Sequence, residues 1–160
     1  MSRPDTLLRT KLAPPGLHRR LLPRPALTEK LRESVDVRLT LVQAGTGYGK
    51  STALAALAEA EPSARLAWCS LDAADADPQR FLAYLIAALR ACLPGLSESP
   101  SAVLQEVTSA GSAGAWTAVV DALINALAGA LDAALLLVID DYDFVAAAPE
   151  ANALAERFIT

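Results

Sequence analysis

Apolar residues recur along the chain in two kinds of pattern, which predict alternating strands and helices. Short unbroken apolar runs are typical of strands covered on both faces of a parallel sheet. Apolar residues that recur every three or four positions are typical of helices with one buried face. The predicted strands are residues 38–43, 65–71 and 134–139. The predicted helices are residues 29–34, 51–60, 78–93, 116–128 and 150–158, with loops at 94–101 and 144–149.

Two of the predicted helices show a clear inward stripe. In the helix at 78–93, the inward residues are Phe81, Leu82, Leu85, Ile86, Leu89 and Cys92. In the helix at 116–128, they are Trp116, Val119, Val120, Leu123, Ile124 and Leu127. Tyr84 and Arg90 lie off the first stripe, and Asn125 lies off the second and is expected to be exposed. Gly129 is expected to end the second helix.

Strands that alternate with helices predict an α/β fold, in which crossover helices connect the strands of a parallel sheet. Residues 1–25 are rich in proline and arginine, which predicts an extended N-terminal arm. Residues 26–160 are long enough to form one domain with a core. Three strands make a small sheet with unpaired edges. We therefore expect the chain to be an N-terminal fragment or a truncated reading frame.

A glycine-rich turn that ends in Gly-Lys-Ser lies between the first predicted strand and its helix. Its residues are Ala44, Gly45, Thr46, Gly47, Tyr48, Gly49, Lys50, Ser51 and Thr52. Glycines let backbone N–H groups point inward, and the helix N-terminus adds partial positive charge, so such a turn binds phosphates. In this pattern Lys50 reaches the β- and γ-phosphates, and the Ser51 hydroxyl binds Mg²⁺. We therefore expect a bound nucleotide.

Ala44 stands where the strict form of this pattern has glycine. Alanine is compatible with the position if the backbone keeps a negative φ there, because Gly45 and Gly47 supply the flexible points. The alternative is a tight strand-to-helix turn with a solvated lysine. A predicted strand before the turn and a helix after it favour the phosphate loop.

The third predicted strand ends in two carboxylates, Asp140 and Asp141. Open α/β sheets bind their ligands at the C-terminal ends of the strands, and Mg²⁺ prefers oxygen ligands. We therefore expect Asp140 to hold Mg²⁺ together with Ser51. Asp141 is expected to orient or deprotonate an attacking water, which makes Asp141 and Lys50 the predicted catalytic pair. Taken alone, the two acids fit a solvated strand end equally well, but a phosphate loop upstream favours the metal site.

A second acidic group consists of Asp72, Asp75 and Asp77. Carboxylates at alternating positions are found in calcium loops, but the central glycine and terminal glutamate of that loop are absent here. Asp77 followed by Pro78 is typical of a helix N-cap with proline at the first helical position. The sequence therefore favours a helix start over a calcium site.

The composition narrows the classes of partner. The formal net charge is −4, so the chain has no broad cationic surface for nucleic acid. Cys69 and Cys92 form no CxxC pair, and with a single histidine they cannot make a zinc site. No apolar stretch reaches the roughly 18 residues of a membrane helix, and no signal peptide is evident. We expect a cytoplasmic protein with reduced thiols and no membrane partner.

Four groups of residues carry a further signal. They are KLAPP at 11–15 with LLPRP at 21–25, AGTGYGKS at 44–51, AWCSLD at 67–72 with DPQRFL at 77–82, and VIDDY at 138–142. In this order and spacing they resemble the N-terminal nucleotide-binding domain of the large ATP-dependent LuxR-type transcription activators, the MalT-like group. That family usually has alanine at position 44. It favours threonine at Ser51 and histidine at Asp143, which leaves a role for position 143 open.

The resemblance implies a P-loop NTPase domain of the signal-transducing type over residues 26–160, present only in part. Its implied adenine contacts are Leu22, Arg24 and Pro25, and its cofactors are ATP or ADP with Mg²⁺. In the related sheet, a later strand lies between the first strand and the acidic strand. That strand, the winged-helix and sensor regions, and the C-terminal DNA-binding domain are absent from this sequence. Self-association through the nucleotide-binding domain is also implied.

Three functions follow as expectations. The first is an ATP-binding switch module, a slow ATPase, of a transcription regulator that contacts DNA only through its missing C-terminal domain. The second is a kinase that transfers phosphate to a small acceptor, which requires an acceptor pocket and a lid with no visible counterpart here. The third is an inactive, truncated remnant that keeps an intact loop sequence. Nucleotide-dependent stabilisation separates the third function from the others.

Overall fold

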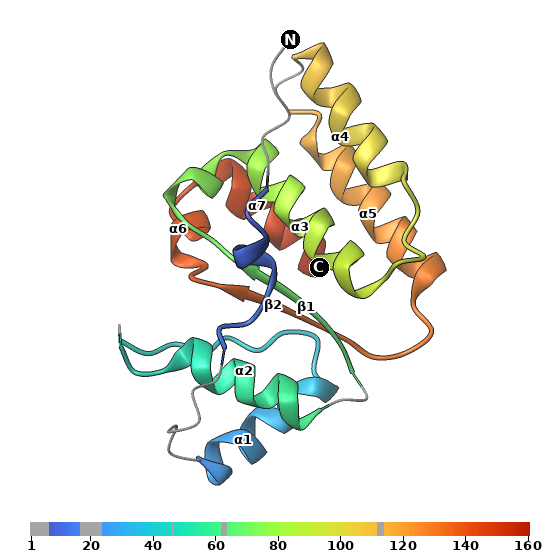
Figure 1. Ribbon diagram of the computed structural model, residues 1–160. Coiled ribbons are helices and arrows are strands. Elements are labelled where there is room, and N and C mark those ends of the chain that lie inside the picture. The colour runs from blue at the N-terminus through green and yellow to red at the C-terminus, as the bar shows by residue number, and fades with distance from the viewer. Residues whose placement is uncertain (1–6, 17–23, 46, 62–63, 112–113) are drawn as a thin grey trace.

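Two parallel strands lie side by side in the middle of the molecule (Figure 1). The computed structural model describes residues 7–16, 24–45, 47–61, 64–111 and 114–160. Strand β1 (Arg65–Ser70) pairs with β2 (Leu135–Asp140) in parallel, from Arg65 opposite Leu135 to Ser70 opposite Asp140. The helices are α1 (Pro25–Arg32), α2 (Lys50–Ala60), α3 (Pro78–Cys92), α4 (Ser99–Ala110), α5 (Trp116–Ala130), α6 (Asp143–Ala146) and α7 (Pro149–Ile159). The short 3₁₀ helices are η1 (Arg9–Leu12), η2 (Glu33–Asp36) and η3 (Ala73–Ala76).

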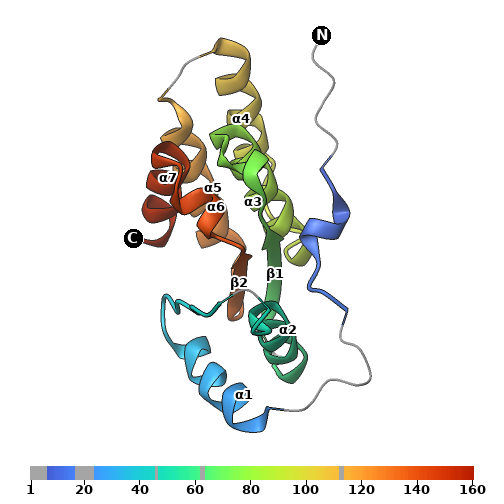
Figure 2. The ribbon, with the colours of Figure 1, turned by 90° about the vertical axis from the view of Figure 1, so that its left-hand side faces the viewer.

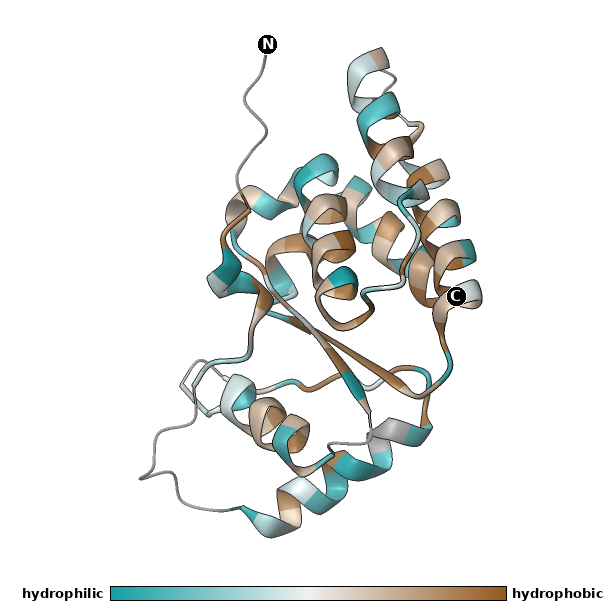
Figure 3. Cartoon of the chain, turned by 45° about the vertical axis from the view of Figure 1, so that its right-hand side comes forward, coloured by the Kyte–Doolittle hydropathy of each residue, from teal (hydrophilic) through white to brown (hydrophobic). Residues whose placement is uncertain are grey.

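Helices cover the sheet from two sides, so the predicted α/β class is confirmed. In Figures 1 and 2, α1 and α2 lie below the strands, and α3, α5, α6 and α7 lie above them. The main core is on the upper side, where Phe81, Leu82 and Leu85 of α3 are at most 1 % exposed. Val119 and Leu123 of α5 belong to the same cluster. Figure 3 shows both strands as largely apolar, as expected for strands that helices cover on both faces. In the same view, α1 carries many hydrophilic residues.

The predicted strand at 38–43 is wrong. Residues 39–45 have no regular secondary structure, and Leu39 and Leu41 are 61 % and 77 % exposed. A strand is held by hydrogen bonds to a neighbouring strand, and β1 and β2 pair with each other instead. The resembling family places a later strand beside this segment, and the described residues contain no such strand. The apolar run is therefore present in the sequence without the partner that would make it a strand.

Three expectations for the α4–α5 region are also wrong. The predicted loop at 94–101 ends in α4, which begins at Ser99 with Pro100 in its first turn and is followed by Gly111 in the left-handed conformation. Proline fits the first turn because its missing N–H would have no partner there. Helix α5 continues through Gly129, and Ile124 on its predicted inward stripe is 39 % exposed.

The N-terminal arm is not extended throughout its described part. Residues 9–12 form η1, and α1 already begins at Pro25, four residues before the predicted helix start. The arm packs on α3 and buries Tyr84, whose position off the predicted stripe did not indicate burial. The Tyr84 hydroxyl accepts the Leu8 N–H at 3.1 Å. Because Leu8 and Tyr84 are far apart in sequence, the spacing of apolar residues along α3 could not predict this contact.

The two cysteines are free, and each lies in the element expected for it. Cys69 on β1 is buried, and Cys92 at the end of α3 is half-buried. Burial raises the pKa of the Cys69 thiol to about 12, so this thiol is protonated at neutral pH. In the described part of the chain, no helix combines the length and apolar character needed to cross a membrane.

Candidate functional site

The glycine-rich turn leads directly into α2. Gly47 and Gly49 have φ values of 80° and 78°, a left-handed backbone that residues with a side chain rarely adopt. Gly49 is the N-cap of α2, and no side chain caps this helix. The first-turn N–H groups of α2 are therefore left open to an external acceptor, and the helix dipole favours an anion there. Thr46 lies outside the described residues.

Lys50 folds back over this turn. Its Nζ donates to the carbonyl oxygens of Ala44 at 2.8 Å and Gly45 at 3.3 Å. The Tyr48 N–H also points to the Gly45 carbonyl, at 3.4 Å, while the Tyr48 side chain is 72 % exposed. The Lys50 ammonium is thus held at the turn by the carbonyl oxygens of two exposed residues. An anionic acceptor binds an ammonium more strongly than a carbonyl does and can replace them.

Asp140 is the last residue of β2, Asp141 follows it, and the two aspartates have different environments. Asp140 is buried, and its Oδ1 accepts the Asp141 N–H at 3.2 Å. Asp141 is exposed and has a φ of 56°, a left-handed backbone that aspartate and asparagine tolerate better than most residues. Burial raises the pKa of Asp141, the charges of Asp140 and Asp143 raise it further, and the charge of Lys50 lowers it.

One cavity of about 430 Å³ brings the two predicted metal ligands together. Ser51 from α2 and Asp140 from β2 both line it, although they are far apart in sequence. The other lining residues are Thr10, Ala13, Pro14, Pro15, Gly16 and Ser70. A hydroxyl and a carboxylate are the oxygen ligands that Mg²⁺ prefers, with water completing the coordination. Ser51 and Asp140 thus line one cavity, while Lys50 and Asp141 are not among its lining residues, and the other residues of the cavity wall were not predicted from the sequence.

Ser70 is a functional candidate that sequence reasoning missed. It ends β1 directly opposite Asp140, and its Oγ accepts the Trp68 Nε1–H at 2.8 Å. This bond leaves the Ser70 hydroxyl proton available to another acceptor. Because parallel strands end at the same edge of a sheet, the rule that identified Asp140 also applies to Ser70.

The predicted adenine contacts are placed only in part. Arg24 and Pro25 stand at the start of α1, are exposed and are not among the residues that line the cavity. Leu22 lies outside the described residues. Among the aspartates of the second acidic group, Asp77 accepts the Arg80 N–H at 3.0 Å and is the N-cap of α3, as predicted. Asp72 pairs with a lysine of the arm.

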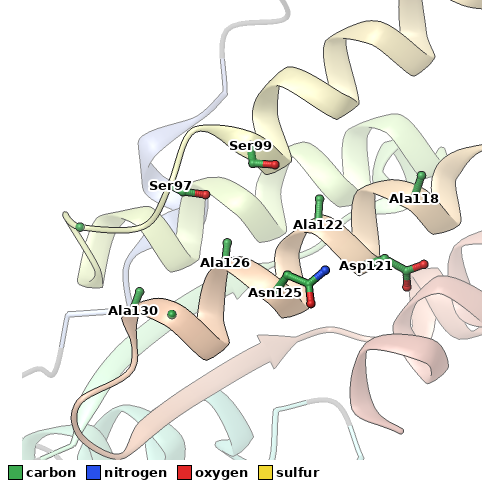
Figure 4. Close-up of a pocket in the computed structure, with 10 residues that line it drawn as sticks. Ser97, Ser99, Ala118, Asp121, Ala122, Asn125, Ala126 and Ala130 are labelled. Carbon is green, nitrogen blue, oxygen red and sulfur yellow. The ribbon is translucent and has the colours of Figure 1, made fainter.

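A larger cavity, of about 620 Å³, lies on the outer face of α5 (Figure 4). Its wall consists of small and polar residues: Gly95, Ser97, Ser99, Ala118, Asp121, Ala122, Asn125, Ala126, Gly129 and Ala130. The Asp121 carboxylate is already paired with Arg157, at 2.8 and 2.9 Å. No residue predicted for nucleotide or metal binding lines this cavity, so its size does not make it the functional site.

No protein-family model matches the chain. The chain is 33 % identical over 139 residues to the HTH-type transcriptional regulator MalT of Yersinia pestis (strain Pestoides F), and the match covers 87 % of this chain. MalT of Yersinia pseudotuberculosis (serotype O:1b, strain IP 31758) matches to the same extent, and MalT of Yersinia enterocolitica is 32 % identical. The chain spans 15 % of the length of these curated relatives. Over most of its own length, the chain is therefore homologous to one segment of the LuxR-type regulator MalT.

Proposed function

We propose that this chain is a magnesium-nucleotide-binding switch domain of a MalT-like, cytoplasmic transcriptional regulator, with a P-loop NTPase fold. The observation that carries the proposal is the shared cavity of Ser51 and Asp140 beside the glycine-rich turn. Homology to a relative described as an HTH-type transcriptional regulator supports the regulatory role. The resemblance of the motifs adds ATP or ADP as the nucleotide.

The residues present fit Mg²⁺ better than a metal held by protein ligands alone. The described residues contain no group of three or more His, Cys, Asp and Glu side chains that could hold a metal. Ser51 and Asp140 offer two oxygen ligands, and Mg²⁺ in nucleotide sites takes the remainder from phosphates and water. The open amides at the start of α2 fit the phosphates of the same ligand.

The residues of the site have separate roles in this proposal. Lys50 would exchange the carbonyls of Ala44 and Gly45 for phosphate oxygens, and the N–H groups of the turn would donate to the same phosphates. Asp141 would accept a hydrogen bond from the attacking water and then its proton. Bound Mg²⁺ would supply charge neutralisation at the phosphates. Leu22, Arg24 and Pro25 remain proposed adenine contacts.

Nucleotide binding would act as a switch through the segment ahead of the turn. Residues 39–43 lead directly into the phosphate-binding turn and have no regular structure. Phosphate contacts at the turn would order this segment, and loss of the γ-phosphate would release it. The ordered state would favour self-association of the domain. DNA contact would come from a separate region, because this chain has a net charge of −4.

An inactive turn is the second candidate function, and one observation favours it. Leu39 and Leu41 are exposed in the segment where a phosphate loop normally follows a paired strand. A turn that lacks this support has more conformations to lose on binding, which lowers its affinity for phosphate. Nucleotide-dependent stabilisation distinguishes the two functions.

Mg²⁺ with ADP or ATP is expected to raise the melting temperature of the chain. A ligand that binds only the folded state stabilises it by about 2.7 kcal/mol at one hundred times its Kd, which corresponds to about 5–10 °C for a chain of this size. Scanning calorimetry measures the shift, with Mg²⁺ alone and ADP plus EDTA as controls. An unchanged melting temperature would support the inactive turn. Conversion of ATP to ADP that requires an added acceptor and yields a phosphorylated acceptor would indicate a kinase instead, and free phosphate without an acceptor would count against a kinase.

A further inference from the structure

Lys11 is a lysine that the fold buries. It lies in η1 with 9 % of its surface exposed. Its Nζ is 2.7 Å from Asp72 Oδ2 and also donates to Asp75 Oδ2. The same ammonium lies 4.6 Å from the centre of the Tyr84 ring, within range of a cation–π interaction. Lysine is almost never buried unless it is paired, so these contacts define a specific position for this cation.

The carboxylate of Asp75 is held equally firmly. Asp75 is fully buried in η3, where it accepts the Asp72 N–H at 2.9 Å and lies 3.5 Å from Arg80 Nε. Burial lowers the pKa of Lys11, but the hydrogen bonds and charges of Asp72 and Asp75 outweigh burial and leave it above its ordinary value. Lys11 is therefore charged in the folded chain, and the ion pairs tie η1 to η3.

The residues on either side of Lys11 line the candidate nucleotide cavity. Thr10 precedes it, residues 13–16 follow η1, and together they form one wall of the cavity that contains Ser51 and Asp140. Figure 2 shows η1 beside β1 and α3, and contacts with both elements support this placement. One wall of the cavity therefore comes from the N-terminal arm and not from the sheet or α2.

We propose that Lys11 is a positioning residue for nucleotide binding, which holds residues 10–16 as a wall of the magnesium-nucleotide cavity through Asp72, Asp75 and Tyr84. This inference rests on the proposed function of that cavity. A role in stability alone would leave the affinity of the folded chain unchanged when Lys11 is replaced. A positioning role lowers the affinity, because apparent affinity falls with the fraction of molecules whose arm is in place.

The substitution Lys11→Met removes the charge and keeps an unbranched side chain. We expect the Kd for MgADP, measured by isothermal titration on the whole chain, to rise about tenfold, as it would if the arm were in place in one molecule in ten. Hydrogen exchange at the amides of residues 8 and 11 is expected to become faster. Tyr84→Phe is the milder second variant, because it removes the acceptor of the Leu8 N–H and leaves Asp75 paired with Lys11. It is expected to raise the Kd roughly threefold.

Two control variants separate positioning from stability. Arg9→Met removes an exposed charge from the same η1, and Leu154→Ala weakens the core in α7, on the far side of α3 from η1 in Figure 2. Both are expected to leave the Kd of the folded chain unchanged. The inference is overturned, and the proposed function stands, if Lys11→Met and Tyr84→Phe bind MgADP like the wild type. The same holds if Leu154→Ala loses as much affinity as Lys11→Met. A wild-type chain that does not bind MgADP would overturn both.

Discussion

Replacement of Lys50 by alanine is expected to abolish nucleotide binding, with a rise of more than about a hundredfold in the Kd for MgADP. Lys50 is the first residue of α2, and among the described residues its ammonium donates to the carbonyls of Ala44 and Gly45. In the proposed complex it donates to phosphate oxygens, and each hydrogen bond to a charged group contributes about 1.5–3 kcal/mol. Isothermal titration of the variant with MgADP measures the loss.

Lys30→Ala is the matched control for this variant, because Lys30 is an exposed lysine in the last turn of α1. Both variants are expected to keep the melting temperature of the wild type in the absence of nucleotide, since neither removes a contact of the core. Wild-type affinity for MgADP in Lys50→Ala would reject the proposed role of Lys50. It would also favour the solvated-lysine interpretation of the turn.

Asp141→Asn is expected to slow ATP hydrolysis by a factor of about 10²–10⁴ while MgADP affinity is retained. Asparagine has the shape of aspartate and adopts the left-handed backbone that position 141 requires, with φ at 56°. The N–H that donates to Asp140 is also kept. The variant therefore removes only the carboxylate that would take a proton from water. Phosphate release at saturating MgATP measures the rate.

The exposed Asp143, two residues further on, offers a matched control. Asp143→Asn makes the same chemical change in the first turn of α6 and is expected to hydrolyse ATP at the wild-type rate. Loss of MgADP binding in Asp141→Asn would make Asp141 a structural residue. A wild-type rate in Asp141→Asn would remove its catalytic role and assign the attacking water to another residue. Ser70, which lines the cavity, is the next residue to test.

The elements that could be predicted from the sequence are those in which the pattern of apolar residues along the element itself indicates which residues are buried. Helix α3 was expected at 78–93 and runs from Pro78 to Cys92, with Asp77 as its N-cap. Strand β2 was expected at 134–139 and runs from Leu135 to Asp140. In both, the pattern of apolar residues and the residues at the ends indicate the same structure, so local information is enough.

The elements that could not be predicted depend on distant partners. The apolar run at 38–43 has strand-like residues, but a strand also needs a neighbour, and no described strand pairs with it. Tyr84 lies off the apolar stripe of α3 and is nevertheless buried, because the arm covers it. Helix α4 does not follow from the sequence pattern, because the proline and serines near its start are typical of loops, although proline also suits a first helical turn.

One part of the candidate site could also be predicted from the sequence, and another part could not. Ser51 and Asp140 could be singled out from the sequence because each belongs to a motif with a known chemical role, and both line one cavity. Their role as metal ligands stays a prediction. The contribution of the arm could not be predicted. It results from ion pairs of Lys11 with Asp72 and Asp75, residues that the sequence indicated only as an acidic cluster. The packing of η1 against η3 and α3 determines which carboxylates pair with Lys11.

A crystal structure of the chain with Mg²⁺ and a nonhydrolysable ATP analogue tests the central claim most directly. We expect the phosphates to lie on the amides of residues 44–52, with the Lys50 ammonium moved from the Ala44 carbonyl to a phosphate oxygen. Mg²⁺ is expected to contact the Ser51 hydroxyl and to be held by Asp140, directly or through water. A well-ordered chain whose turn carries no phosphate at saturating ligand, or whose metal lies away from Asp140, would contradict this account.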